Sequence, residues 1–331
     1  MRIAIVKLSA LGDIVHAMVV LQFIKKFNKE ISIDWIVDES YKDLLEFHPD
    51  INKVHFLNLK KAKKKKSIPI LIKELKKIRK LTPYDIVVDM QGLIKSAVVS
   101  RIIPSKVTIG FDRNSLREGL ASTLYNKKFK YSYSKNIIER NFELIKFALE
   151  MPFQKEDIKN KLPFLYDHKQ DEISILSNTK KNVILIPGAS HITKRYSPEN
   201  FSKMTNLLDV NYLVIWGDDE EKIIAEQIKK LSPKVNICNK MTLSSLISVF
   251  CQVDLVIGAD TGPTHIAWAL NVPSITLFGP TPGHRNAYIT KINKIIESNS
   301  KVDPYRINKK DYSISDIDVQ EILNYARRLL F

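Results

Sequence analysis

Cysteine is scarce in this chain of 331 residues, which contains Cys238 and Cys251 and no others. Two cysteines do not make a disulfide framework, and no cluster of cysteine and histidine has the spacing of a structural zinc site. The composition therefore excludes a disulfide-stapled secreted domain and favours a reducing compartment.

Long apolar runs are also missing. No stretch of 18 or more apolar residues occurs, so no segment is expected to span a bilayer. Near the N-terminus, Lys7 and Asp13 interrupt the apolar run before it reaches the length of a signal peptide, and no cleavage-like segment follows. We expect a cytoplasmic protein whose contact with a membrane is peripheral.

Two common ligand fingerprints are absent. The turn after the first apolar run contains Gly12 but no GxGxxG pattern, which argues against a nicotinamide site. The loop 258–265 has no DxD-like carboxylate pair. The sequence therefore implies no required cofactor, and it is compatible with Mg²⁺ without calling for it.

Positive charge is abundant and unevenly distributed. The net charge is +16, and residues 1–150 hold 29 Lys and Arg against 16 Asp and Glu, which places +13 of the total in that half. Such a field attracts an anionic partner without specifying it, so nucleic acid, an anionic membrane and an acidic substrate all fit. The choice among them depends on the motifs.

Short β-rich apolar runs alternate with longer amphipathic stretches, which is the βαβ rhythm of a parallel sheet. The length favours two domains. The expected strands fall in two series, 3–8, 33–37, 54–56, 86–89 and 107–109, then 183–187, 212–216, 235–237, 254–257 and 274–278. Between them, 151–182 is polar and contains prolines, as a linker would be.

We therefore predict an α/β fold of two Rossmann-like, doubly wound parallel-sheet domains facing a central cleft. The first covers residues 1–155, and the second covers 156–331, including the linker and a closing helix over 315–330. Ligands of such domains lie beyond the carboxyl ends of the strands. The functional residues should accordingly follow strands.

The segment KLSALGDIVHA places Asp13 just after the first strand. Asp13 has two possible roles: an N-cap for the helix expected to begin near it, or a general base that takes a proton from an acceptor hydroxyl. Asp89 and Asp112 also follow strands and are reserve candidates for the base.

The segment DLVIGADTGPTHIAWALNV carries the strongest signal for a donor site. A helix is expected to start near Pro263, so the N–H groups of Thr261 and Gly262 would lie at its positive end and suit a diphosphate. Asp260 would repel phosphate but suits sugar hydroxyls. His265, one turn later, is either a ligand contact or a structural histidine.

Two further loops follow strands of the second series. In LIPGASHITKRYSPENF, a loop with Ser190 and Lys194 precedes a helix that Ser197 would cap. Lys194 is either a solvated lysine or the cation that neutralises a leaving diphosphate. In WGDDEEK, Glu220 or Glu221 would bind ribose hydroxyls, although surface charge explains both equally well.

A basic tract, LKKAKKKKSIPILIKELKKIRK, contains six lysines between Lys60 and Lys66. Such a run is commonly a solvated face. It has no interleaved aromatic residue, which counts against a surface that stacks single-stranded bases. An anionic lipid or an acidic sugar is the favoured partner.

Several segments together resemble the ADP-heptose:lipopolysaccharide heptosyltransferases: KLSALGDIVHA, IDWIVDES, DMQGLIKSA, GFDRNSLREGLAS and DTGPTHIAWALNVPSITLFGPT. The similarity spans nearly the whole chain. DTGPTH belongs to the wider family, whereas DMQGLIKSA and GFDRNSLREGLAS are similar to its type I members. The spacing of HITKRYS and the nearly pure lysine tract depart from the family pattern.

This resemblance implies the GT-B fold and an inverting transfer of heptose from ADP-heptose to a Kdo residue of Kdo-lipid A at the cytoplasmic face of the inner membrane. It implies catalytic roles for Asp13 and Lys194. The donor contacts implied are Ser190, Lys194, Glu220, Asp260, Thr261, Gly262 and His265. The basic half would face the acceptor and the anionic membrane surface, with Lys60, Lys61, Lys64, Arg113 and Arg117 as contacts.

Two rival interpretations remain at this stage. One is a sister enzyme of the type II heptosyltransferases, with the same donor and a different acceptor. The other is a non-enzymatic binder of polyanions or nucleic acid, which the basic half supports but which leaves DTGPTH unexplained. We expect no nucleic-acid partner.

Overall fold

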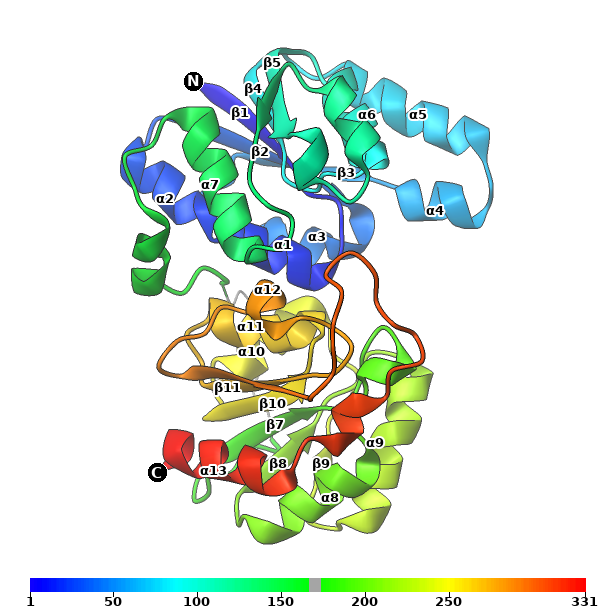
Figure 1. Ribbon diagram of the computed structural model, residues 1–331, viewed down its shortest axis with the longest axis vertical. Helices are drawn as coiled ribbons and strands as arrows, with labels where there is room; N and C mark the ends of the chain where they lie inside the picture. The colour runs from blue at the N-terminus through cyan, green and yellow to red at the C-terminus, as the bar shows by residue number, and fades with distance from the viewer. Residues whose placement is uncertain (167–173) are drawn as a thin grey trace. The chain divides into compact units, whose positions relative to one another are not determined.

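The first unit of the chain, Met1–Lys161, is built on one parallel sheet. The computed structural model describes residues 1–166 and 174–331 (Figure 1). In order, the elements of this unit are β1 (Arg2–Val6), α1 (Leu11–Met18), α2 (Val20–Phe27), β2 (Ser32–Asp38), η1 (Glu39–Tyr41), α3 (Lys42–Leu45), β3 (Lys53–Leu57), α4 (Leu59–Lys64), α5 (Ile68–Arg79), β4 (Tyr84–Asp89), α6 (Ile94–Ile102), β5 (Ser105–Phe111), η2 (Arg113–Ser115), η3 (Gly119–Leu124), β6 (Lys127–Phe129), α7 (Ile137–Leu149) and η4 (Lys155–Asn160).

The second unit, Leu162–Phe331, repeats this plan. Its elements are β7 (Asn182–Ile186), η5 (Ile192–Lys194), α8 (Pro198–Leu207), β8 (Asn211–Val214), α9 (Asp219–Leu231), β9 (Asn236–Ile237), α10 (Leu243–Phe250), β10 (Leu255–Ala259), α11 (Gly262–Ala269), β11 (Ser274–Phe278), α12 (Gly283–Asn286), β12 (Asn293–Glu297), η6 (Ser313–Asp316) and α13 (Val319–Leu330).

Both sheets have the same strand order. It runs β3-β2-β1-β4-β5-β6 in the first unit and β12-β11-β10-β7-β8-β9 in the second. Each is therefore the doubly wound order in which the chain returns to the middle of the sheet and then builds in the opposite direction. The switch point lies between β1 and β4 in one unit and between β7 and β10 in the other. Ligands of doubly wound sheets bind at the carboxyl side of these switch points.

Helices cover both faces of each sheet because parallel strands are apolar on both sides. In the first unit α1, α2 and α7 pack together on one face, and α5 packs with α6 on the other (Figure 1). In the second unit α8, α9 and α13 form one layer, and α10 and α11 form the other. Fully buried strand residues such as Val183, Leu185 and Leu255 form the core between the layers.

The ten strands expected from apolar runs are present, and the α/β class is confirmed. β6 and β12 were not expected, and both lie at sheet edges, where a strand has one neighbour and a less apolar sequence. The closing helix begins at Val319 with Asp318 as its N-cap, so the expected start at residue 315 is wrong. The units divide at Lys161, and residues 167–173 of the predicted linker lie outside the described residues.

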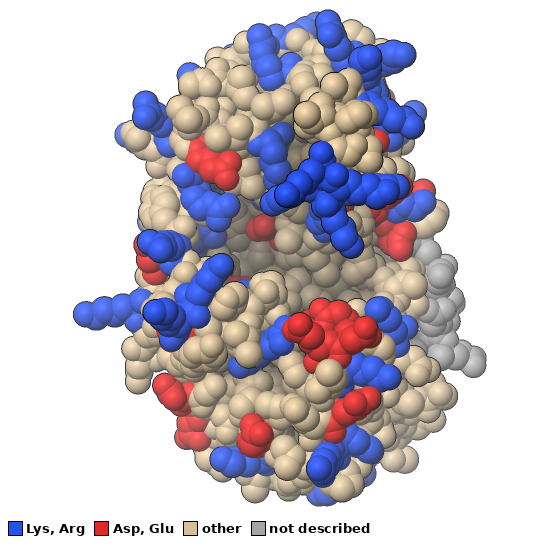
Figure 2. Space-filling model, turned by 90° about the vertical axis from the view of Figure 1, so that its right-hand side faces the viewer, with Lys and Arg blue, Asp and Glu red and all other residues tan. Residues whose placement is uncertain are grey.

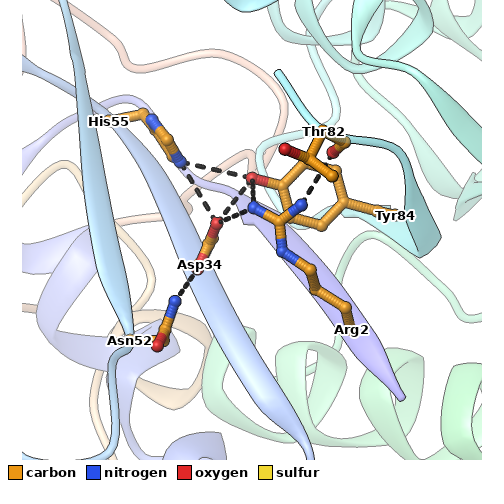
Figure 3. A network of polar contacts seen from close by, with 6 residues as sticks. All are labelled: Arg2, Asp34, Asn52, His55, Thr82 and Tyr84. Atoms are coloured by element: carbon orange, nitrogen blue, oxygen red, sulfur yellow. Dashed lines mark hydrogen bonds and ion pairs between the residues drawn. The ribbon is translucent and has the colours of Figure 1, made fainter.

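A buried polar network joins four strands of the first sheet near the amino ends of β1 and β4 (Figure 3). Asp34 on β2 accepts hydrogen bonds from Tyr84 (2.6 Å), Arg2 (2.7 Å) and Asn52 (3.0 Å), and it lies 3.2 Å from His55 Nε2. Burial alone would raise the pKa of Asp34, but these partners hold it well below its usual range. The network lies away from the strand ends that carry ligands and ties the strands together.

Candidate active site

The predicted donor site of the second unit lies at its switch point, where loops leave the paired strands β7 and β10. β7 leads into the loop that carries Lys194, and the neighbouring strand β10 ends at Ala259, directly before Asp260. Because β7 and β10 are paired and parallel, both loops leave the same edge of the sheet side by side. Residues 66 positions apart in the sequence are thereby brought into contact.

Lys194 and Asp260 form a buried ion pair, with Lys194 Nζ 2.8 Å from Asp260 Oδ2 and side chains 10% and 8% exposed. Of the two roles left open for Lys194, that of a solvated lysine is wrong, because the side chain is buried against a carboxylate. Thr193 beside it is fully buried, and His191 accepts a bond from the Thr193 amide, which fixes the short helix η5. Lys194 is therefore a positioned cation.

Asp260 is surrounded by donors. His265 Nε2 lies 3.2 Å from Oδ1, while the Thr281 hydroxyl (2.8 Å) and the Asn286 amide (3.3 Å) both donate to Oδ2. Burial would raise the pKa of Asp260, but the Lys194 ammonium and the His265 ring outweigh it, so the pKa lies far below its usual range. The residue is an anion that keeps its charge.

Thr281 and Asn286 were not identified from the sequence. Thr281 follows β11, the strand next to β10, and Asn286 ends the short helix α12. The positional signal that selected Asp260, a polar residue just after a strand, applies equally to Thr281. Asn286 had no such signal, because a turn of helix separates it from the strand.

Helix α11 begins at Gly262, with Thr261 as its N-cap, so Pro263 is the second residue and not the first as expected. Thr261 makes no side-chain cap bond, and Pro263 has no N–H. Because α11 begins two residues after Asp260, its positive N-terminal end lies close to the Lys194–Asp260 pair. Such a helix end suits a diphosphate. Gly258 is essential to this packing, since an added Cβ would lie 2.7 Å from Ile186 and 2.8 Å from Thr264.

The two neighbouring glutamates differ in their surroundings. Glu220 is exposed and pairs with Arg195 at 3.2 Å. Glu221 accepts a bond from the Gly217 amide at 2.7 Å, and its carboxylate lies where a Cβ on Gly188 would be, 2.1 Å from that position. Glu221 thus lies over the ends of β7 and β8. The ribose role given to Glu220 stays a prediction, and the geometry makes Glu221 the better placed of the two.

Ser190, the remaining predicted donor contact, is exposed in the turn after β7. Ser197 caps α8 as expected, with its hydroxyl 3.1 Å from the Asn200 amide. In the described ranges, no group of three His, Cys, Asp or Glu gathers as metal ligands would.

Asp13 lies in the first turn of α1, which starts at Leu11. The expectation that it is an N-cap is wrong, because Ala10 holds that position and Asp13 is the third residue of the helix. Its carboxylate accepts a bond from the Ala10 amide at 3.3 Å and is only partly buried.

The loop before Asp13 is fixed from the neighbouring strand. Gln91, just after β4, accepts hydrogen bonds from the Leu8 and Ser9 amides at 3.1 Å each. β1 and β4 are the strands of the switch point, so this bridge is the counterpart of the Lys194–Asp260 pair in the second unit. Gln91 was quoted in a motif but not assigned a role from the sequence.

The reserve candidates for the base have other duties. Asp89 is fully buried and accepts bonds from the hydroxyls of Ser96 and Tyr125 and from the amides of Gln91 and Gly92. Burial raises its pKa in spite of these bonds. Asp112 caps η2 through the Ser115 amide at 2.9 Å. Asp89 is therefore not accessible, whereas Asp112, like Asp13, is partly buried and accepts one bond from a backbone amide.

The acceptor candidates all follow strands of the first sheet. Lys60, Lys61 and Lys64 lie on α4, after β3, while Arg113 and Arg117 lie after β5. β2, β1 and β4 separate β3 from β5, so these two strands lie about 20 Å apart at the strand spacing of ~4.8 Å, and the two basic groups follow strands on opposite sides of the switch point. Lys60 Nζ also donates to the Tyr41 hydroxyl at 2.8 Å. A broad anionic ligand could bridge them.

Comparison with known proteins agrees with this geometry. The profile described as glycosyltransferase family 9 (heptosyltransferase) matches residues 71–312. The chain belongs to this family. The lipopolysaccharide heptosyltransferase 1 of Campylobacter coli is 39% identical over 344 aligned residues, covering 99% of each chain. That of Escherichia coli K12 is 28% identical and covers 87% of this chain and 91% of its own.

A solved structure shares the fold of this family 9 glycosyltransferase. E. coli heptosyltransferase WaaC with ADP superposes with a TM-score of 0.80 at 24% identity, covering 99% of this chain and 100% of that one. The resemblance expected from the sequence and the GT-B fold class are thereby confirmed. The non-enzymatic alternative does not account for membership of a glycosyltransferase family.

Proposed function

We propose that this glycosyltransferase transfers L-glycero-D-manno-heptose from ADP-heptose to a Kdo residue of Kdo-lipid A, in the assembly of the lipopolysaccharide inner core. The observation that carries the proposal is the charged cluster at the start of α11. It combines a fixed cation, a helix N-terminus and a carboxylate that accepts hydrogen bonds. These are the groups needed to hold a diphosphate and a sugar together.

The donor is bound by the second unit. An ammonium has three N–H donors and Asp260 takes one, so Lys194 retains donors for the diphosphate. Asp260 Oδ2 already accepts three bonds, from Lys194, Thr281 and Asn286, whereas Oδ1 accepts one, from His265. Oδ1 is therefore the oxygen that would accept a heptose hydroxyl. Asp260 serves both to position Lys194 and to recognise the sugar.

The chemistry follows from these positions. Asp13 takes the proton of the acceptor hydroxyl as the hydroxyl oxygen bonds to the anomeric carbon from the face opposite the leaving group. The bond from that carbon to the diphosphate breaks, and ADP departs with the electron pair. Lys194 and the amides of α11 stabilise the charge that develops on the leaving oxygen. The configuration at the anomeric carbon is inverted.

The acceptor is held by the first unit, where the lysines of α4 and the arginines after β5 face the Kdo carboxylates and lipid A phosphates. In the part of the chain that the structure describes, no helix is long and apolar enough to cross a membrane. We place the enzyme in the cytoplasm, peripherally on the cytoplasmic face of the inner membrane, with no requirement for a metal cofactor and with no nucleic-acid partner.

The decisive experiment is mass spectrometry of Kdo-lipid A and of an acceptor that already carries one heptose, each incubated with ADP-heptose. A gain of one heptose on Kdo-lipid A alone supports the type I assignment. A gain on the heptosylated acceptor alone would support the type II alternative, and no gain on either would overturn the proposal.

The base assignment is tested by Asp13→Asn. Asparagine can still accept the Ala10 hydrogen bond through its carbonyl oxygen but cannot take the proton. Melting temperature and ADP-heptose affinity should stay unchanged while turnover falls by about 10²–10⁴-fold. Asp89→Asn is the comparison, since loss of that buried carboxylate should destabilise the fold. Turnover of Asp13→Asn near the wild-type rate would exclude Asp13 as the base.

A further inference from the structure

The first unit contains a pocket next to the proposed acceptor contacts, one of which, Lys60, lines it. It has a volume of about 540 Å³ and lies among α4, α5, α6 and the end of β1. Its walls are mostly apolar and include Leu8, Leu59, Ala62, Leu71 and Val98. Every lining residue belongs to this unit, so the pocket is a feature of the unit itself.

The pocket opens to solvent through apolar side chains. Ile68 is 68% exposed, Leu71 39% and Val98 36%, although all three line its wall. Ile68 and Leu71 lie one turn apart on α5 and so share a face of that helix. A small polar ligand would leave these apolar side chains exposed to water, whereas a chain of methylene groups would cover them.

The mouth is ringed by lysines, among them Lys63, Lys66 and Lys95. In the described ranges none of these three forms an ion pair, and Asp38, the one carboxylate that lines the pocket, is held by Ser40 and by the Lys60 amide. Figure 2 faces the side of this unit that carries α4 and α5 and shows Lys and Arg gathered there. The ring thus retains a positive charge that calls for an anion.

An apolar pocket with a cationic rim matches a molecule with an apolar tail and an anionic head. The cavity is too apolar for a sugar, whose hydroxyls would lose hydrogen bonds to water without replacement. The apolar wall and the lysines that line it together point to a charged lipid at a bilayer surface.

We propose that this pocket receives one acyl chain of an anionic phospholipid of the membrane, while the lysine ring binds its phosphate, so that α4 and α5 dock the enzyme on the bilayer. The inference rests on the proposed function only in that the acceptor is held in a membrane. The docked lipid is a membrane phospholipid, distinct from the acceptor, and it takes no part in the transfer.

Flotation of the full chain with vesicles tests the proposal. Binding is expected to vesicles of phosphatidylglycerol and phosphatidylcholine, to weaken with salt, and to be absent from phosphatidylcholine alone. Lys63→Gln should lower the partition constant about fivefold. The double variant Ile68→Asn/Leu71→Asn should lower it by about tenfold or more, because the wall loses apolar contact with the chain.

Two variants separate a filled pocket from a helix that merely lies in the bilayer surface. Val98→Trp should fill the cavity and weaken binding, whereas a tryptophan on a surface-inserted helix would strengthen it. Ile72→Asn is the matched control, since Ile72 is 46% exposed on α5 but does not line this pocket. It should change binding by less than about twofold. Melting temperatures of all variants establish that they are folded.

A phosphatidylglycerol with a photoreactive group at the end of one acyl chain gives the direct readout. Cross-links are expected on residues 59–75 and 94–99. Cross-links elsewhere, undiminished binding by Val98→Trp, or equal losses for Ile72→Asn and the double variant would overturn the proposal. Transfer by the unchanged enzyme to an acceptor without acyl chains is assayed separately, so that failure of the proposed function is recognised by itself.

Discussion

Removing the ammonium of Lys194 should destabilise the second unit far more than removing an ordinary surface lysine. Lys194→Met keeps the length and apolar stem of the side chain and leaves Asp260 buried without its cation. Breaking a buried pair from one side costs about 3–5 kcal/mol. Asp260 keeps its bonds from His265, Thr281 and Asn286, so we expect the lower end of that range.

The pH dependence gives an independent check with a definite sign. The pKa of Asp260 is depressed in the folded chain, so its contribution to stability is present above the unfolded pKa near 4 and is lost as the pH falls. In Lys194→Met the Asp260 carboxyl has lost its cation, so it takes up a proton more readily as the pH falls. The difference in unfolding free energy between wild type and variant should therefore be largest at neutral pH and shrink below about pH 4.

Calorimetry and urea unfolding measure this loss, with Lys180→Met as the control. Lys180 pairs with Asp209 at 2.6 Å, but the two side chains are 48% and 72% exposed, so its removal should leave the free energy of unfolding almost unchanged. Lys194→Met/Asp260→Asn should recover part of the stability because no buried charge is left unpaired. A Lys194→Met variant as stable as the control, or a double variant as unstable as the sum of its parts, would refute the reasoning.

Three further outcomes are expected. Glu221→Gln should weaken ADP binding by about tenfold and Glu220→Gln by much less, measured by calorimetry, because Glu221 lies over the strand ends; equal effects would contradict this. Asp34→Asn should destabilise the first unit by about 3 kcal/mol at neutral pH. The loss of stability should become smaller below about pH 4, because the pKa of Asp34 is depressed in the folded chain and its contribution to stability disappears in acid. A loss that does not depend on pH would contradict this prediction. Replacing the α4 lysines Lys60, Lys61 and Lys64 together with glutamine should raise the KM for the acceptor and make that KM less dependent on salt. Steady-state kinetics measure both, and the KM for the donor is the internal control.

The sequence predicted the buried strands well because their apolar runs are a direct consequence of burial on both faces. Two of the four edge strands, β6 and β12, were missed for the same reason, since edge strands need not be apolar on both faces. β6 has the sequence KKF, and its lysines are tolerated because one side of the strand faces solvent. The helices α1, α11 and α13 begin one to four residues away from the predicted starts. Several residues near each start suit a helix terminus, as Asp13 does at α1, so the sequence does not single out the residue at which the helix begins.

The candidate site was predictable to the level of which residues follow strands. The pairing of Lys194 with Asp260 was not, because it depends on β7 and β10 being neighbours, a fact of topology that no local pattern contains. Asp89 illustrates the same limit. It is the last residue of β4, close to the position that Asp260 takes directly after β10, and only burial and four hydrogen bonds remove it from the candidates for the base.

The two switch points assign opposite roles to their carboxylates. In the second unit Asp260 is buried against Lys194 and His265, which hold the charge on the carboxylate so firmly that it cannot accept a proton near neutral pH. In the first unit the corresponding bridge is made by Gln91, which is neutral and leaves Asp13 partly exposed without an ion pair among the described residues. A base must be able to gain a proton, and a fixed counter-ion must not. On this ground we propose Asp13 as the carboxylate that moves the proton, and Asp260 as the one that holds Lys194 and the sugar in place.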